Sequence, residues 1–240
     1  MELSGHGPLH LGVAQVVPVS MAPLRELKPA RRWTLLLVGI LVLGTVSVAG
    51  VPGWRHALLR SLGWALVAQD PAAKADIIVV SSDSLGAGML EAADLVKAGF
   101  AARVAIFDRG QTQLQRELVR RGAPAYDPKG FSLSVLHSQG VSDIVLLPEV
   151  AGTTDEGRVL QQWCAANSIH SLLFISVTDH SRRTRRVLDR ALGQHGIRVM
   201  VRYTRWSQFD PDSWWRSRDG QRVQITESQK LLVDILRHPF

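Results

Sequence analysis

Cysteine is nearly absent from this sequence, which contains a single one, Cys164. One cysteine excludes an intrachain disulfide framework and any metal site built from several thiolates. Cys164 lies in "QQWCAAN", a stretch that predicts a helix. Because a buried cysteine behaves as a small hydrophobic residue, we expect Cys164 in the core.

Glycine-rich nucleotide motifs are also missing. No GxGxxG follows the first apolar strand, and no GxxxxGK[ST] occurs anywhere in the 240 residues. These are the loops that hold dinucleotides and the phosphates of P-loop substrates. The sequence therefore gives no support to either of those two classes.

The chain is basic, with a formal charge of +7, but it lacks nucleic-acid motifs. It contains no zinc-finger spacing and no basic-aromatic motif of the RNP type. We therefore expect no nucleic-acid partner. A basic surface close to anionic lipid or cell-wall polymer accounts for the charge.

Charge is entirely missing from residues 33–51, "WTLLLVGILVLGTVSVAGV". A helix of these 19 residues is about 28 Å long, close to the hydrocarbon thickness of a bilayer. A cleaved signal peptide is the alternative, although "SVAG" is a poor cleavage site. The run predicts a single transmembrane anchor.

The basic residues around this run predict its orientation. Arg25, Lys28, Arg31 and Arg32 crowd its N-terminal flank. The positive-inside rule then places the N-terminus in the cytoplasm and the rest of the chain outside, in the periplasm. The predicted parts are a cytoplasmic tail (1–32), an inner or plasma membrane anchor (33–51), an amphipathic connecting helix (52–74) and a globular domain (75–240). The connecting helix could lie on the membrane or pack on the domain.

Strand and helix patterns alternate through the globular domain. The predicted strands are 76–81, 103–107, 143–148, 171–176 and 197–203. The predicted helices are 88–99, 111–122, 131–140, 153–167, 181–196 and 226–236. Continuous apolar strands separated by amphipathic helices are typical of parallel strands covered on both faces. We therefore predict an α/β fold with a Rossmann-like open parallel sheet.

Ligands of such sheets bind beyond the carboxyl ends of the strands. The candidate loops are therefore 81–84, 108–110, 149–156 and 176–183. Thr153 and Glu156 have the spacing of a capping box, which leaves capping alone or capping with ligand contact open. Asp83 follows the first strand and could bind a hydroxyl, a metal or a proton, or simply cap a turn.

An arginine-rich stretch, "SVTDHSRRTRR", follows the fourth predicted strand at residues 176–186. Positive side chains in the first turns of a helix are opposed by its macrodipole. We expect Arg182, Arg185 and Arg186 to be surface charges. His180 and Arg183 are instead expected to face the pocket and bind an acidic group.

The chain resembles the YdcF-like family, which includes the SanA and ElyC envelope proteins. Ser176, His180 and Arg183 fit a family spacing in which a Thr at a strand end precedes a His by four positions and an Arg follows three later. An acidic residue, a Thr and a Glu of the family resemble Glu149, Thr154 and Glu156. The closing pattern resembles "WWRSRDG" with "ESQK", namely Trp214, Trp215, Gly220, Glu227 and Lys230. The resemblance covers roughly residues 75 to 237.

Three departures from the family fall around the expected pocket. A Gly-rich turn after the first strand is replaced by "SSDS", and an "SGG"-like turn after the second is "DRG". An arginine of the first helix corresponds to Met89 or Gly88. These changes predict an altered ligand or a weakened activity.

The resemblance implies an envelope protein with a pocket at the strand ends, with no settled reaction. It suggests S-adenosylmethionine as a cofactor and a role in cell-wall or lipid-carrier metabolism. We expect an anionic or nucleotide-like small molecule as the ligand. The residues expected to bind it are Asp83, Thr154, Glu156, Ser176, His180, Arg183, Glu227 and Lys230. The alternative is a non-catalytic partner of envelope-synthesis proteins with a vestigial pocket.

Overall fold

The computed structural model describes residues 33, 34, 36–40, 44, 50–125 and 127–239. The chain divides into two compact units, residues 1–50 and residues 51–240. Nine of the 19 residues of the predicted anchor, 33–51, lie outside the described residues. Within the described residues, no helix combines the length and the apolar character needed to cross a membrane.

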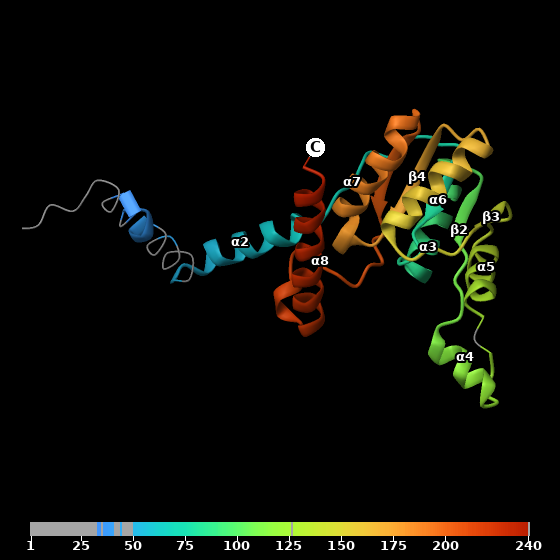
Figure 1. Cartoon of the computed structure of the whole chain (residues 1–240), viewed down its shortest axis with the longest axis horizontal. Helices are drawn as coiled ribbons and strands as arrows, with labels where there is room; N and C mark the ends of the chain where they lie inside the picture. The colour runs from blue at the N-terminus through green and yellow to red at the C-terminus, as the bar shows by residue number, and fades with distance from the viewer. Residues whose placement is uncertain (1–32, 35, 41–43, 45–49, 126, 240) are drawn as a thin grey trace, which may run out of the picture. The chain divides into compact units, whose positions relative to one another are not determined.

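Five parallel strands form a single sheet in the order β3-β2-β1-β4-β5 (Figure 1). In the pairing register, Ile78 of β1 lies opposite Val104 of β2 on one side and opposite Leu173 of β4 on the other. The predicted Rossmann-like parallel sheet is therefore confirmed. The strands are β1 (Ile77–Val80), β2 (Val104–Phe107), β3 (Ile144–Leu147), β4 (Ser171–Ser176) and β5 (Arg198–Tyr203).

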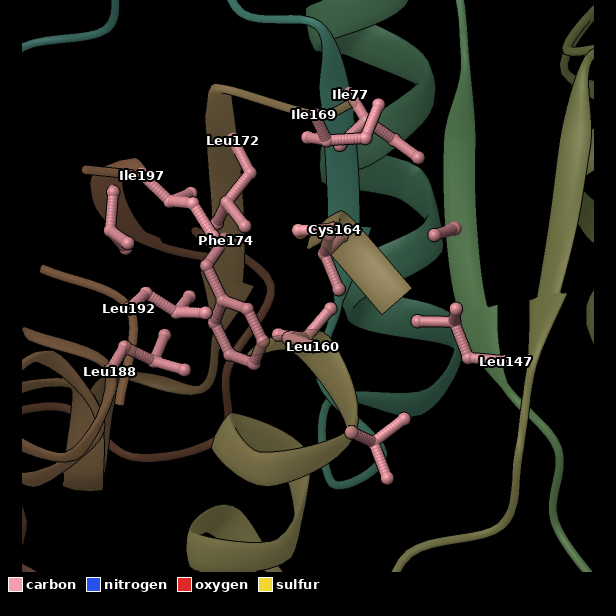
Figure 2. Close-up of a cluster of buried hydrophobic side chains, with 14 of the residues drawn as sticks. Ile77, Leu147, Leu160, Cys164, Ile169, Leu172, Phe174, Leu188, Leu192 and Ile197 are labelled. Atoms are coloured by element: carbon pink, nitrogen blue, oxygen red, sulfur yellow. The ribbon is translucent and has the colours of Figure 1, made fainter. Parts of the chain in front are cut away.

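Alternate residues of each strand point to opposite faces, so the sheet has two separate apolar layers. Ile77 and Val79 pack in a cluster with residues of α6 (Thr153–Ala166) and α7 (Ser181–Leu192). The other face packs against α3 (Leu85–Lys97) and α5 (Pro128–Ser138). Figure 2 shows the first layer, in which Phe174 of β4 lies between Leu160 and Leu192. Both faces are covered, which explains the continuous apolar strands.

Cys164 lies in the first of these layers and is fully buried, as predicted (Figure 2). Burial raises the pKa of its thiol to about 11. A thiol with so high a pKa is almost never a thiolate at neutral pH, and it is therefore unreactive. Cys164 is a core residue and no part of the candidate site.

Of the two remaining helices of the domain, α4 (Gln113–Arg120) lies close to its predicted bounds and α8 (Arg218–Arg237) does not. α4 has no buried residue and lies apart from the sheet in Figure 1, with its start closed by a Thr112–Gln115 capping box. α8 begins eight residues before the predicted 226–236 helix. The Ser217 hydroxyl accepts a hydrogen bond from the N–H of Gly220 and so provides a helix cap that the pattern analysis missed.

The helix before the domain, α2 (Pro52–Trp64), packs on the domain through its last turns. The indole of Trp214 donates to the carbonyl of Leu59, and the amide of Gln224 donates to that of Leu62. Gly63 permits this approach, because a Cβ there would lie 2.3 Å from the carbonyl oxygen of Pro211. Of the two predicted placements, packing on the domain is therefore observed for this end of the helix.

Two arginines of α7 hold the segment that precedes β1. Arg182 is exposed, but its guanidinium donates to the carbonyl of Val67 at 2.8 Å. Arg185 is only partly exposed and forms an ion pair with Asp70, whose carboxylate also accepts from the N–H of Val201. The prediction that these arginines are simple surface charges is therefore wrong, because both fasten the connecting segment to α7.

Two further arginines of α7 share one carboxylate of α8. Arg186 and Arg190 both form ion pairs with Asp234, whose side chain is only 11% exposed. Arg186 also donates to the carbonyl of His238 at 2.6 Å. The surface interpretation of Arg186 is likewise wrong. Charges on the early turns of α7 are tolerated because carboxylates and carbonyls of other segments pair with them.

We predict that Asp234→Asn destabilises the chain by about 2 kcal/mol at pH 7, the cost of removing charge-assisted hydrogen bonds. Burial raises the pKa of Asp234, but hydrogen bonds from Arg190 and Arg186 outweigh it, so the pKa lies below its usual value. A carboxylate whose pKa is lowered by folding stabilises the folded state above about pH 4. This stabilisation is lost as the pH falls further and the carboxylate is protonated. The difference between wild type and variant in urea unfolding should therefore shrink at pH 3.

The exposed Asp219, near the start of the same helix, provides the control. Asp219→Asn should unfold nearly as wild type at both pH values. Equal stability of wild type and Asp234→Asn at pH 7 would show that the α7–α8 ion pairs contribute nothing.

Candidate functional site at the strand ends

The strand order reverses between β1 and β4. From β1 the chain continues to β2 on one side, whereas β4 lies on the other side of β1 and continues to β5. The loops that follow β1 and β4 therefore diverge and leave a crevice at the carboxyl edge of the sheet. Residues 81–84 and 177–180 form these two loops.

Glu156 of α6 is fully buried behind the loop after β1. Its Oε1 atom accepts hydrogen bonds from the Ser81 hydroxyl at 3.0 Å, the Ser82 hydroxyl at 2.9 Å and the Ser82 N–H at 2.7 Å. Its Oε2 atom is buried and has no hydrogen-bond partner among the described residues. Burial, with a smaller contribution from the Asp83 charge, raises the pKa of Glu156 against the effect of these bonds. The carboxyl group can thus hold a proton on Oε2.

The predicted capping box of Thr153 and Glu156 does not form. The N-cap of α6 is Gly152, whose φ of 147° favours glycine, and Thr153 is already helical. The third helical residue is therefore Asp155, whose carboxylate accepts from the N–H of Ala151 at 3.2 Å. This arrangement leaves Glu156 free to bind the β1 loop.

His180 lies at the end of a 3₁₀ turn after β4, Thr178–His180, and is 5% exposed. Its Nδ1 atom lies 3.4 Å from Oδ2 of Asp179, and its Nε2 atom lies 3.6 Å from Oδ2 of Asp83. The second distance is too long for a hydrogen bond, so Nε2 has no such partner in the described part of the chain. The imidazole therefore links the β4 loop to the β1 loop and keeps one ring nitrogen available.

Ser176 lies at the last position of β4 and is fully buried. Its hydroxyl is 3.4 Å from that of Thr184 in α7, and its carbonyl accepts from the N–H of Thr204. These contacts join the strand end to α7 and to the loop after β5. The structure places Ser176 behind the site, as a support for the turn that carries His180.

Arg183, Glu227 and Lys230 come together between α7 and α8. The carboxylate of Glu227 is buried and accepts from Arg183 Nη2 at 3.2 Å and from Lys230 Nζ at 2.7 Å. Arg183, which was predicted to bind an acidic group of a ligand, is thus already paired with a carboxylate of the chain. Glu227 nevertheless pairs with two cations, so these three side chains together have a net charge of one positive unit.

Asp179, which is not among the predicted binding residues, joins this group. Ligand atoms of Asp179, His180 and Glu227 all lie within 4.8 Å of one another. Such a set could hold a divalent cation. The two cations bonded to Glu227 oppose a metal ion here, but they are balanced by the carboxylates of Glu227 and Asp179, so charge alone does not favour an anionic group either. Asp179 makes no capping hydrogen bond to α7.

Thr154 lies apart from Glu156, because helix positions that are two residues apart face different directions. It is exposed and lines a groove of about 800 Å³ between α6, α7 and α8. Arg183 and Lys230 line the same groove. The predicted residues thus divide into a strand-end group (Asp83, Glu156 and His180) and a neighbouring group facing the groove.

A smaller cavity of about 210 Å³ lies beyond the ends of β1, β2 and β3. Its lining includes Asp83, Asp108, Arg109 and Glu149, so the predicted strand-end loops do meet there. Glu149 packs tightly over Gly110, where a Cβ would lie 2.5 Å from the carboxylate. The cavity extends the strand-end site toward β3.

The departures at the first turn have structural consequences. Leu85 adopts a φ of 46°, in the left-handed region that favours glycine, and its side chain is 49% exposed. Met89 is buried in the apolar layer of α3. Gly88 has no room for a longer side chain, because a Cβ would lie 2.1 Å from the Ser84 hydroxyl. Neither position can project an arginine into the site.

The paired tryptophans and Gly220 serve the structure of the C-terminal region. Trp214 bonds to α2, Trp215 stacks on His56 with ring centroids 6.0 Å apart, and both belong to a short turn before α8. Gly220 packs against this turn, since a Cβ would lie 2.3 Å from the carbonyl oxygen of Trp214. These residues attach α2 to the domain.

No protein-family model matches the chain, and the curated proteins contain no match to it.

We predict that Glu156→Gln preserves the fold and removes a pH dependence of stability. The pKa of Glu156 is raised in the folded state, so its contribution is greatest below about pH 4.5 and decreases as the pH rises through the folded pKa. Gln retains an oxygen for the three donors and carries no charge. At pH 8 the variant should be at least as stable as wild type, in urea unfolding measured from pH 4 to pH 8.

Glu156→Ala is the matched comparison. It removes the acceptor of three hydrogen bonds and should cost about 2 to 3 kcal/mol near pH 4, and its difference from wild type should narrow as the pH rises. If Glu156→Gln and Glu156→Ala destabilise the folded chain equally, or if Glu156→Gln keeps the pH dependence of wild type, the carboxyl group is charged in the folded state. Our description of Glu156 would then be wrong.

Proposed function

We propose that this chain is a membrane-anchored YdcF-like protein of envelope biogenesis, which binds an anionic or nucleotide-like small molecule at the strand ends. One observation supports the site most strongly. Two polar atoms, Oε2 of Glu156 and Nε2 of His180, are buried without a hydrogen-bond partner in the described part of the chain. Burying such atoms unpaired is costly, so a ligand that bonds to them would compensate.

Each residue would contribute by its chemistry. Asp83 and Glu156 would accept bonds from hydroxyl groups, and Glu156 could also donate or receive a proton. His180 would bond to the ligand through Nε2. Arg183 and Lys230, which together exceed the charge of Glu227, would attract the acidic group. Thr154 would provide a hydroxyl at the edge of the site.

S-adenosylmethionine is the first ligand to test, because the family resemblance suggests it and its ribose hydroxyls and carboxylate suit these residues. Peptidoglycan or lipid-carrier metabolism is the proposed setting. A second candidate is a non-catalytic partner of envelope-synthesis proteins. The replacement of the family's glycine-rich turn by residues 81–84, directly before the strained Leu85, favours this alternative, because it changes the loop at the end of β1.

We predict that the full chain, purified in detergent, retains a small molecule that mass spectrometry can detect after denaturation. His180→Ala and Glu156→Gln should each reduce its occupancy about fivefold, the effect of losing one hydrogen bond to the ligand. His195→Ala is the control, since His195 is exposed at the far end of α7. Undiminished retention in both folded site variants would contradict a strand-end site, and an absence of any retained or added ligand would favour the non-catalytic alternative.

We also propose that residues 33–51 form a single transmembrane anchor with the domain outside the cytoplasm. The support is their complete lack of charge and the four basic residues that precede them. Reporters fused after Phe240 should be active only if they work in the periplasm. Activity of a cytoplasmic reporter at this position would reverse the proposed orientation.

A further inference from the structure

The groove between α6, α7 and α8 has properties that the strand-end site does not explain. It has a volume of about 800 Å³, large enough for a drug-sized or nucleotide-sized ligand. Arg158, Arg190, Lys230 and Arg237 line it from three different helices. Among the described residues, Asp234 is the only carboxylate in its lining.

Cations outnumber carboxylates around this groove even after every observed ion pair is counted. Glu227 is shared by Arg183 and Lys230, and Asp234 is shared by Arg186 and Arg190. Arg158 forms an ion pair with Asp155, which it does not share with another cation among the described residues. Arg237 forms no ion pair within the described residues. These six cations and three carboxylates leave a net charge of +3. A cleft whose walls carry charge of one sign focuses the electrostatic field on a ligand inside it.

The centre of the groove is apolar. Val187 and Ala191 of α7 and Val233 of α8 contribute to its lining, and Val233 is 44% exposed. Glu227 and Asp234 are two turns apart on α8, so their cation pairs are separated by about 10 Å along the helix axis. A ligand in this groove would meet cations at both ends and a hydrophobic surface between them.

From this arrangement we propose that the groove is a second binding site, which takes a phosphate ester with an adjoining apolar or aromatic portion. Guanidinium groups match phosphate oxygens in geometry as well as in charge. The same chemistry is offered by a soluble nucleotide and by the headgroup of an anionic lipid. Arg183, Lys230 and Thr154 line this groove and are also assigned to the proposed strand-end ligand, but Arg190 and Arg237 line the groove alone and therefore distinguish the second site from the first.

Arg190 and Arg186 form a matched pair for testing this site. Both bond to Asp234, but only Arg190 lines the groove, and either one alone leaves Asp234 with a partner. Inorganic diphosphate should bind the full chain in detergent, measured by isothermal titration calorimetry at 50 mM salt. Arg190→Gln should raise its Kd about tenfold or more, whereas Arg186→Gln should raise it less than about threefold. Arg237→Gln, which breaks no observed ion pair, should weaken binding without affecting the fold.

Competition then distinguishes the two sources of phosphate. A fluorescent nucleoside diphosphate bound in the groove should be displaced by dihexanoyl phosphatidate more strongly than by glycerol phosphate if the natural ligand is a lipid. Equal displacement by the two would indicate a soluble phosphate ester. Either result supports the site, provided that Arg190→Gln weakens it. The proposal is overturned if diphosphate does not bind saturably, or if Arg186→Gln weakens binding as much as Arg190→Gln. Failure of the strand-end site would leave these titrations unchanged, since neither His180 nor Glu156 takes part.

Discussion

The buried carboxyl group of Glu156 determines how the edge of this sheet is organised. It joins the first turns of α6 to the loop after β1 through three hydrogen bonds to one oxygen atom. The other oxygen remains without a partner in the described part of the chain, and burial favours its protonated form. A group of this kind is poorly suited to stability alone, because an apolar side chain would avoid the cost of burying it. Its presence is easier to understand if a ligand or a transferred proton uses the free oxygen.

Helix α7 connects this edge to the rest of the chain. It begins directly after His180, and its arginines bond to the segment before β1 on one side and to α8 on the other. The same helix thus positions the strand-end turn and provides a wall of the basic groove. Its charge therefore has two consequences. Ion pairs fix the neighbouring segments, and the surplus of cations gives the groove its positive field.

The sequence predicted the sheet well because each strand is a continuous apolar run bounded by turn residues. All five strands lie within about one residue of their predicted limits. Candidate loops followed from the same pattern, since parallel strands must present their carboxyl ends at one edge. Asp83, Glu156 and His180 do meet there, although they come from different loops.

Partners of charged side chains were not predictable in this way. Helical spacing indicated which arginines share a face, but Asp70 and Asp234 approach α7 from segments far away in the sequence. The capping box failed because the backbone of Gly152 begins α6 one residue earlier than the motif requires. Asp179 was overlooked because its position beside Glu227 depends on how α8 packs. Each of these features depends on contacts between segments that are distant in the sequence. A local sequence pattern carries no information about such contacts.

We infer that the two loops at the β1–β4 switch point bind a ligand between them, and hydrogen–deuterium exchange of the full chain with and without S-adenosylmethionine tests this inference. We expect slower amide exchange in residues 81–84 and 177–183 when the ligand is present, and no such change in Glu156→Gln. Unchanged exchange in these loops, with wild-type protein saturated by the ligand and protection confined to other segments, would contradict it.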